Sequence, residues 1–250
     1  MNKFNKLPLQ SMTIHEKKDP FGKACLAYLK GIKGLEIVVA SDHAEDDTIP
    51  VDYLFRKYEN MPLIEQTALD LCRGKILDIG AGAGCHSSYL KSIGHNITAI
   101  DQSPGAVTAM KEQNISAKNL DFFNLNEEDK YDTLIALMNG TGIAGTVENF
   151  SNFLVKCSKL LNYNGQLLID SSDIIYLFEN DEELYNFSGD KYYGEVEYQM
   201  KFDNESSDWF NWLYLSYGKL QEICKQQNCQ CELVVEGDHF DYLAKISFNH

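Results

Sequence analysis

The stretch that decides the fold is Lys75-Ile-Leu-Asp-Ile-Gly-Ala-Gly-Ala-Gly-Cys-His-Ser-Ser88, where a short apolar run passes directly into three glycines spaced two residues apart. The residues before Gly80 have the composition of a strand buried on both faces, and residues 84–94 carry a helical pattern. At such a junction the free N–H groups of the helix start favour a negatively charged group or a closely approaching ligand. A tight turn without a ligand is the alternative that the spacing alone leaves open.

Strand and helix patterns alternate through the middle of the chain. The expected strands lie at residues 75–80, 96–101, 117–123, 131–139 and 166–170. The expected helices between them lie at residues 84–94, 104–114 and 147–161. This order predicts an α/β fold with a mostly parallel sheet and helices on both faces. A sheet of this kind binds its ligands at the carboxyl ends of its strands.

The segments that flank this core carry other patterns. Before it, a strand is expected at residues 35–41 and helices at residues 21–31, 50–61 and 62–72. After it, two aromatic-rich segments favour an antiparallel hairpin, at residues 192–202 and 208–217. A helix at residues 217–228 is then followed by two closing strands, expected to be antiparallel, at residues 231–238 and 240–248.

The charge of the chain limits its partners. The 37 acidic and 22 basic residues give a formal net charge of −15. Such a chain repels phosphate backbones and anionic membrane surfaces, so neither nucleic acid nor a membrane is expected as a partner. No segment reaches the ~18 uninterrupted apolar residues of a membrane span.

The seven cysteines are expected to be reduced thiols. The N-terminus has no apolar run followed by a small-residue cleavage site, which favours a cytoplasmic protein in which disulfides are rare. Cys224, Cys229 and Cys231 form C-x4-C-x-C without a well-spaced fourth ligand. Buried thiols are therefore favoured over a zinc site, and no metal is expected.

The glycine spacing narrows the choice of ligand. A dinucleotide fingerprint, G-x-G-x-x-G, needs a glycine three residues after Gly82, where Cys85 stands. This departure disfavours an NAD-linked or FAD-linked oxidoreductase. A phosphate-binding P-loop is excluded because no Gly-Lys-Ser/Thr follows.

Asp78-x-Gly80-x-Gly82-x-Gly84 after a buried strand, with Asp101 at the end of the next strand, resembles the class I S-adenosylmethionine-dependent methyltransferases. The resemblance covers residues 75–173 and implies a Rossmann-like fold. That fold has a mostly parallel seven-stranded sheet with helices on both faces, antiparallel C-terminal strands and an N-terminal helical cap.

The resemblance also implies how the chain is divided. Residues 1–74 would form an N-terminal cap or lid, and residues 75–250 the methyltransferase domain, with an aromatic-rich insertion at about 174–210. Residues 52–75 are similar, in addition, to a bacterial set of methyltransferase-domain proteins of unassigned substrate.

The implied cofactor is S-adenosyl-L-methionine, with S-adenosyl-L-homocysteine as its product. By resemblance, the backbone of Gly80, Ala81 and Gly82 contacts the amino-acid end of the cofactor, and Asp78 holds the loop or the ammonium group. Asp101 would accept hydrogen bonds from both ribose hydroxyls, because its two oxygens match a vicinal diol. A cap of the following helix is the structural alternative for Asp101.

Six further residues are expected at the cofactor. Gln102 would lie beside the adenosine, while Asp121 and the backbone of Phe122 would contact adenine. Met138 and Asn139 face the methionine part by position, and Arg56 is a candidate to clasp its carboxylate from a lid. For Asp121 a solvated strand end is the alternative, and for Arg56 an ordinary surface position.

Transfer of a methyl group from a sulfonium is an in-line displacement that depends on alignment and exclusion of water. An acceptor that must lose a proton also needs a base. His86, Asp170 and His239 are the candidates, and the catalytic residue stays unassigned. A polar partner in the first helical turn is the alternative for His86, and capping or turn formation is the alternative for Asp170. Asn139 is followed by Gly140 rather than by the N/D-P-P-Y/F pattern, which disfavours methylation of a base or a glutamine amide.

The sequence therefore favours an S-adenosylmethionine-dependent methyltransferase that acts on an unidentified small molecule. A protein methyltransferase and a non-catalytic S-adenosylmethionine-binding module are the alternatives. Aromatic residues crowd the segment 176–217, Trp209 and Trp212 among them. They would line a pocket for the acceptor, fill the core of the hairpin, or bury the contact of a homodimer.

Overall fold

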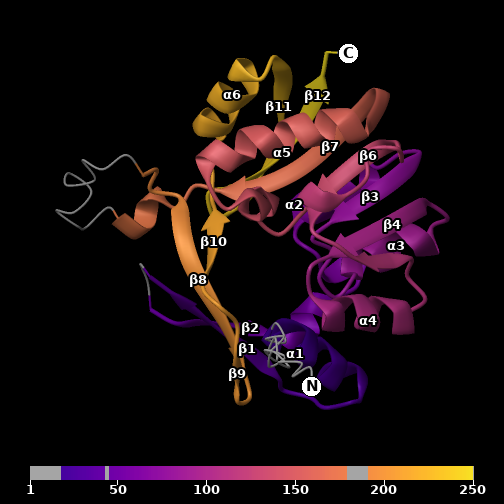
Figure 1. The fold of residues 1–250 in the computed structure, drawn as a ribbon, viewed down its shortest axis with the longest axis vertical. Helices are drawn as coiled ribbons and strands as arrows, with labels where there is room; N and C mark the ends of the chain where they lie inside the picture. Colours follow the sequence, from indigo (N-terminus) through magenta and orange to yellow (C-terminus); the bar gives the residue numbers. More distant parts are fainter. Residues whose placement is uncertain (1–17, 43–44, 179–190, 250) are drawn as a thin grey trace, which may run out of the picture.

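The computed structural model describes residues 18–42, 45–178 and 191–249. Parts of the expected cap at residues 1–74 and of the expected insertion at about 174–210 lie outside the described residues. Within the described part, the strands form one seven-stranded sheet and one five-stranded sheet. Figure 1 shows the larger sheet with the smaller one beside it.

The larger sheet has the strand order β11-β12-β7-β6-β3-β4-β5. Its parallel strands are β3 (Lys75–Ile79), β4 (Asn96–Asp101), β5 (Ala117–Asn119), β6 (Tyr131–Ala136) and β7 (Leu161–Ser172). Its antiparallel strands are β11 (Cys229–Glu236) and β12 (Asp241–Phe248). The predicted fold class is thereby confirmed.

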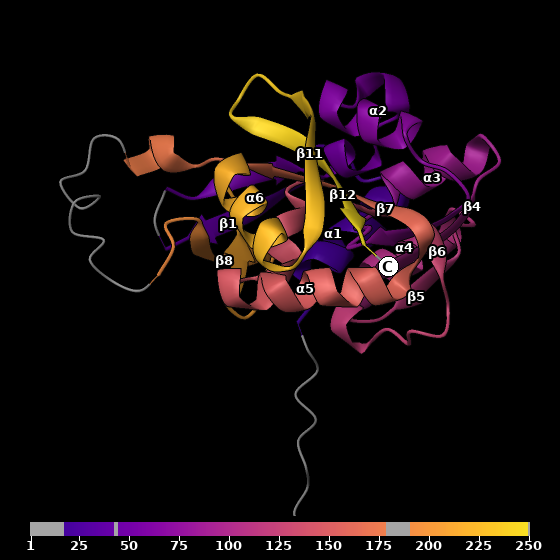
Figure 2. The same cartoon turned by 90° about the horizontal axis from the view of Figure 1, so that it is seen from above.

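Helices cover both faces of this sheet, as Figure 2 shows. One face packs against α5 (Val147–Leu160) and α6 (Tyr217–Gln226). The other face packs against α2 (Leu63–Asp70), α3 (Cys85–Ser92) and α4 (Pro104–Glu112). In β3, Leu77 and Ile79 face α5 whereas Ile76 faces α2, which explains why the strand is apolar at almost every position.

The smaller sheet, called the cap sheet below, joins two segments that lie far apart in the chain. It has the order β10-β8-β1-β2, with β9 paired to β8. Its strands are β1 (Glu36–Ser41), β2 (Asp47–Pro50), β8 (Glu195–Phe202), β9 (Glu205–Ser206) and β10 (Phe210–Leu213). The antiparallel register of β1 and β8, with Val39 opposite Met200, fixes the N-terminal segment to the late hairpin. The sequence predicted strands in both segments but not their pairing.

The cap sheet is attached to the larger sheet at the carboxyl ends of the parallel strands. On one side, α1 (Pro20–Leu29), which packs on β8 and β1 of the cap sheet, lies against α4, with Gly22 directly on Gly105. On the other side, β10 lies on the 3-10 helix η4 (Gly140–Ala144), where the Trp212 indole covers Gly142. Both attachments therefore lie at the edge where an α/β sheet binds its ligands.

The predicted helix at residues 50–61 is wrong. That segment forms two short 3-10 helices, η1 (Val51–Phe55) and η2 (Tyr58–Asn60), separated by extended backbone at Arg56 and Lys57. The helical pattern is interrupted because the Arg56 side chain is held in the interior by Glu65 and by the Tyr53 carbonyl. Tertiary hydrogen bonds thus outweigh the local helical preference.

Two more 3-10 helices, η3 (Phe122–Asn124) and η5 (Ile175–Phe178), complete the described elements. Among the described helices, none combines the length and the apolar character that crossing a membrane requires.

Candidate active site

The loop from β3 to α3 needs its glycines for their backbone conformation. Gly80, Gly82 and Gly84 have φ angles of +69°, +55° and +86°, which side chains other than hydrogen strongly disfavour. The N–H groups of Gly80 and Ala81 both donate to the carbonyl of Ile100, at 3.0 Å each. Gly80 is exposed while Ala81 is buried, so a strip of bare peptide faces outward at the carboxyl end of β3.

Asp78 lies beneath this loop. Its carboxylate is 2 % exposed and accepts a hydrogen bond of 2.7 Å from the Ser87 hydroxyl in the first turn of α3. Burial raises the pKa of Asp78, against the opposing effects of His86 and Ser87. Asp78 therefore holds the start of α3 to the end of β3 and gives the glycine loop a fixed base.

Asp101 ends β4 next to the same loop. One carboxylate oxygen accepts from the Gly82 N–H and the other from the Ser103 N–H, each at 2.8 Å. Burial raises the pKa of Asp101, although these two backbone bonds act against the rise. Each oxygen keeps a second lone pair, so the carboxylate can still accept from a vicinal diol. Gln102, the next residue, is exposed.

Asp121 and Phe122 lie after β5 and play different parts. Asp121 caps η3 by accepting from the Phe123 N–H at 2.9 Å and stays half-buried. The Phe122 ring is 2 % exposed and lies in the core, with its centroid 4.8 Å from that of Phe153. Only the backbone of Phe122 is therefore suited to contact a ligand.

A strained turn follows β6. Met138 and Asn139 adopt φ angles of +68° and +59°, a conformation that is costly for both and that proteins retain most often at functional sites. Asp170 on β7 holds the turn, accepting from the N–H groups of Met138 at 3.1 Å and Gly140 at 3.0 Å. Burial raises the pKa of Asp170 to about 6, against the opposing effect of the backbone N–H groups of Gly140 and Asn139.

A buried ionic cluster lies beside this turn and the glycine loop. The Arg56 guanidinium donates to both oxygens of Glu65, and His86 Nε2 lies 2.8 Å from Glu65 Oε2. The Arg56 and Glu65 side chains are only 3 % and 5 % exposed. The Tyr53 ring stacks on the guanidinium, whose carbon lies 4.0 Å from the ring centroid. Arg56 Nε is buried and has no hydrogen-bond partner among the described residues, so it is free to donate to a ligand.

Comparison with known proteins identifies the family. Residues 76–165 match the family described as methyltransferase domain. An S-adenosylmethionine-dependent methyltransferase from Bacteroides fragilis, solved with S-adenosyl-L-homocysteine, is 40 % identical to this chain. The match covers 92 % of this chain and 95 % of that one, with a TM-score of 0.85. The chain belongs to the S-adenosylmethionine-dependent methyltransferases.

Two further relatives are more distant from this methyltransferase. The probable S-adenosyl-L-methionine-dependent methyltransferase TehB of Haemophilus influenzae (strain 10810) is 30 % identical over 95 residues. That match covers 34 % of this chain and 33 % of the relative, so the chain spans about a third of the relative's length. The CcbJ methyltransferase from Streptomyces caelestis is 11 % identical, with a TM-score of 0.55 over 76 % of this chain and 91 % of that one, and shares the fold.

The geometry of the site fits S-adenosylmethionine, the cofactor of the family. A side chain at Gly80 would have its Cβ 3.0 Å from Ile143, and one at Gly82 would have its Cβ 3.4 Å from Phe21. The positive φ angles at both positions, together with the close approach of Ile143 at Gly80, keep this loop free of side chains where the amino-acid end of the cofactor would lie. Asp101 offers the acceptors that ribose needs, and the unpartnered Arg56 Nε is a donor suited to a carboxylate.

The three candidate bases of the methyltransferase are not brought together. His86 is 4 % exposed and bound to Glu65, and Asp170 is 8 % exposed and holds the turn after β6. His239 is exposed in the turn between β11 and β12, where its N–H donates to Asp241. The first two residues are thus buried and hydrogen-bonded within the protein, and the third lies in an exposed turn. None of the three has an open position beside the glycine loop.

Sequence reasoning missed two acids that organise the site. Glu65 was assigned only to a helix, although it binds both Arg56 and His86. Asp19 caps α1 through Gly22 N–H and also accepts from Ser103 Oγ and the Gly105 N–H, at 2.8 to 2.9 Å. An acid directly before Pro20 is a common helix start, and this signal could have found Asp19. Nothing in the sequence indicates the partners of Glu65.

The buried histidine predicts a pH dependence of stability. Burial alone would lower the pKa of His86, but the Cys85 sulfur and the Glu65 carboxylate raise it well above its ordinary value. A raised histidine pKa stabilises the fold fully below the unfolded pKa of about 6.5, and this stability is lost as the pH rises through the folded pKa. Between pH 6.5 and 8 we expect the free energy of unfolding to fall, by at most about 1.4 kcal/mol per pH unit.

Urea unfolding at several pH values measures this slope, and His86→Gln should abolish it. A wild-type profile without a slope would contradict the assignment.

The contact between α1 and α4 predicts that a methyl group is not tolerated at Gly22. A Cβ there would lie 2.2 Å from Asp19 Oδ2 and 2.6 Å from the Gly105 Cα. Gly22→Ala should therefore displace α1, and with it Phe21, from the glycine loop, at a cost of about 1–3 kcal/mol in the free energy of unfolding. Calorimetry should also show weaker binding of S-adenosyl-L-homocysteine.

Gly218→Ala is the matched control, because a Cβ at Gly218 meets no atom within 4 Å. Equal behaviour of the two variants would refute the prediction.

Proposed function

We propose that this methyltransferase transfers the methyl group to a small-molecule acceptor bound between the cap sheet and the carboxyl ends of the parallel strands. The observation that carries the proposal is the attachment of the cap sheet on two sides of the cofactor site. One attachment is the contact of α1 with α4, and the other is the contact of β10 with η4. A site enclosed from both sides suits a small acceptor better than a folded protein or a polymer.

The side chains beside this site suit an apolar or aromatic acceptor. Val39 and Met200, opposite each other in the cap sheet, pack in one cluster with Met138 from the turn after β6. Trp212 lies on Gly142 at the other attachment and is only half-buried. These groups offer apolar contact area with few charges, as small-molecule sites generally do.

The chemistry that we propose depends on alignment. S-adenosylmethionine, when bound, supplies a methyl group activated by its sulfonium. Asp101 would hold the ribose hydroxyls and Arg56 Nε the carboxylate, so that the methyl group points away from the glycine loop toward the cap sheet. The cap would exclude water and set the acceptor in line. The engagement of His86 and Asp170 in structural bonds supports a reaction that does not rely on either as a base.

The partners and location form part of the same proposal. The net charge of −15 supports an acceptor other than nucleic acid, because such a charge repels phosphate backbones. It also argues against binding to an anionic membrane surface. The seven free cysteines support a reducing, cytoplasmic setting.

The test is a screen that measures release of S-adenosyl-L-homocysteine. Purified protein and S-adenosylmethionine are incubated separately with a low-molecular-mass metabolite fraction and with the protein fraction of the same extract. We expect release only with the metabolite fraction, and none with Asp101→Ala under the same conditions. Release with the protein fraction alone would replace the proposal by protein methylation. Tight binding without release in either fraction would favour a role that requires no transfer.

A further inference from the structure

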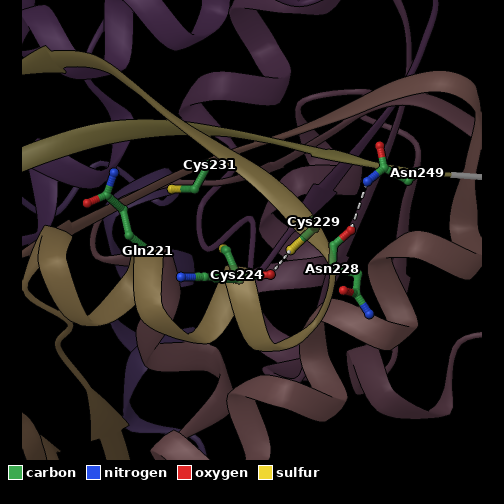
Figure 3. Close-up of a pocket in the computed structure, with 7 residues that line it drawn as sticks. Gln221, Cys224, Asn228, Cys229, Cys231 and Asn249 are labelled. Atoms are coloured by element: carbon green, nitrogen blue, oxygen red, sulfur yellow. Dashed lines mark hydrogen bonds between the residues drawn. The ribbon is translucent and has the colours of Figure 1, made fainter.

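Three thiols meet at the contact between α6 and β11. Cys224 lies on α6, and Cys229 and Cys231, two residues apart on β11, share the face that packs on that helix. Figure 3 shows the three side chains between the helix and the strand, with Cys229 Sγ directed at the carbonyl of Cys224. That contact is a hydrogen bond of 3.3 Å.

A surface cavity of about 430 Å³ opens onto all three cysteines. Cys224 is 1 % exposed and Cys229 8 % exposed, whereas Cys231 is partly exposed. Lys225 also lines the cavity. A small reagent in the cavity would therefore meet Cys231 before the two more deeply buried thiols.

The cavity is separate from the methyl-transfer site. Cys229 pairs with Phe248 at the end of β12, whereas Asp241 at the start of β12 pairs with Ser172. Ser172 lies at the carboxyl end of β7, so the cysteines lie toward the opposite edge of the larger sheet. Nothing in the proposed reaction uses these thiols.

The three thiols differ in their readiness to ionise. Hydrogen bonds to Cys229 and Cys231 raise the pKa of Cys224, which acts as the donor. Hydrogen bonds with Cys224 lower the pKa of both Cys229 and Cys231 below the ordinary value, although burial acts to raise it. Cys231 is the more exposed of these two thiols, so a reagent in the cavity reaches it more readily than Cys229. Cys224, which lines the same cavity, is the neighbouring thiol that can resolve it.

We propose that Cys231 and Cys224 form a peroxide-sensitive dithiol, a modification site independent of methyl transfer. The Cys231 thiolate attacks one oxygen of hydrogen peroxide, the O–O bond breaks, and with one proton taken up the products are a sulfenic acid and water. The Cys224 sulfur then attacks the sulfenic sulfur, the S–O bond breaks, and the disulfide forms with release of a second water. The two thiols are oxidised by two electrons and the peroxide is reduced by two.

The position of Lys225 makes this disulfide simple to map. Trypsin cuts after Lys219, Lys225 and Lys245, so Cys224 lies in one peptide and Cys229 with Cys231 in the next. The two peptides stay together only where a disulfide joins them. Full-length reduced protein is treated with hydrogen peroxide, blocked with an alkylating reagent, digested, and analysed by mass spectrometry with and without dithiothreitol.

We expect the wild-type protein to lose two of its seven thiols and to yield the joined peptide, both reversed by dithiothreitol. Cys229→Ser should behave like the wild type, because Cys229 is outside the proposed pair. Cys231→Ser should lose no thiols under the same exposure. In Cys224→Ser, dimedone should trap a sulfenic acid at Cys231, because the resolving thiol is absent.

Three results would overturn the proposal. The first is a wild-type protein that keeps all its thiols in excess peroxide, a result that needs no variant to fold. The second is loss of the joined peptide in Cys229→Ser, which would assign the disulfide to Cys229. The third is a wild-type disulfide that maps to Cys157, which lies in the same core cluster as Cys229.

Discussion

Replacement of Glu65 by alanine is expected to lower the free energy of unfolding by about 3–5 kcal/mol. Glu65 is the only acid whose carboxylate bonds Arg56 and His86 among the described residues, and all three side chains are buried. His86 and Arg56 hold the pKa of Glu65 below its ordinary value although burial acts to raise it. Removal of the carboxylate leaves two neighbouring cations without their partner in the interior, which is among the costliest single changes in a protein.

Urea denaturation followed by circular dichroism measures this effect. Glu222→Ala is the matched control, because Glu222 makes an ion pair with Lys219 on the surface of α6, where its side chain is 52 % exposed. Such pairs contribute little, so the control should unfold like the wild type. Glu65→Gln should lie between the two, since it keeps an acceptor for Arg56 but not the charge. A Glu65→Ala variant as stable as the control would show that the cluster is not held by its charges.

Replacement of Asp101 by alanine is expected to weaken binding of S-adenosyl-L-homocysteine by about 1–3 kcal/mol, or roughly 5- to 150-fold. The carboxylate already accepts from the Gly82 and Ser103 N–H groups, so it is held in place before a ligand binds. Its remaining lone pairs are the acceptors that we assign to the ribose hydroxyls. The variant also leaves the Gly82 N–H without its partner, so part of the loss comes from a looser glycine loop.

Calorimetric titration of the folded variant gives the affinity. Asp129→Ala is a suitable control, since Asp129 forms an exposed ion pair with Lys75 at the start of β3, away from the carboxyl ends of the strands. Asp101→Asn separates the two contributions, because its amide oxygen can still accept one hydrogen bond. Unchanged affinity in a folded Asp101→Ala variant would remove Asp101 from the cofactor site.

The parts of the site that the sequence predicts are those that local chemistry dictates. Gly80, Gly82 and Gly84 follow a run of buried-strand residues, and their positive φ angles are what such spacing requires. Asp101 was located because the strand pattern places an acid at the next carboxyl end. The order of strands and helices follows from hydrophobic periodicity. Helices cover both faces of the sheet, so its parallel strands are apolar at nearly every position and can be recognised in the sequence.

The features that the sequence did not predict depend on hydrogen bonds between separate elements of the fold. Residues 50–61 carry a helical pattern, yet the bond from Arg56 to Glu65 breaks it into two 3-10 helices. Asp170 was placed at a strand end as a candidate base, with turn formation as the alternative, and its carboxylate holds the turn at Met138 and Gly140. In each case a buried hydrogen bond between different elements decides the role, and no periodicity records such a bond.

What the sequence by itself determined is the sheet and its glycine loop, because strand burial and glycine geometry are local properties of neighbouring residues. The class of cofactor followed from the resemblance of that loop and of Asp101 to a known family. Only the tertiary structure decided that Val39 lies opposite Met200, that Asp19 joins the first turns of α1 and α4, and that Glu65 stands between Arg56 and His86. The physical reason is that these contacts pair groups that meet only in the folded structure, so neither hydrophobic periodicity nor local propensity records them. The position of the cap sheet at the carboxyl ends of the parallel strands belongs to the second set.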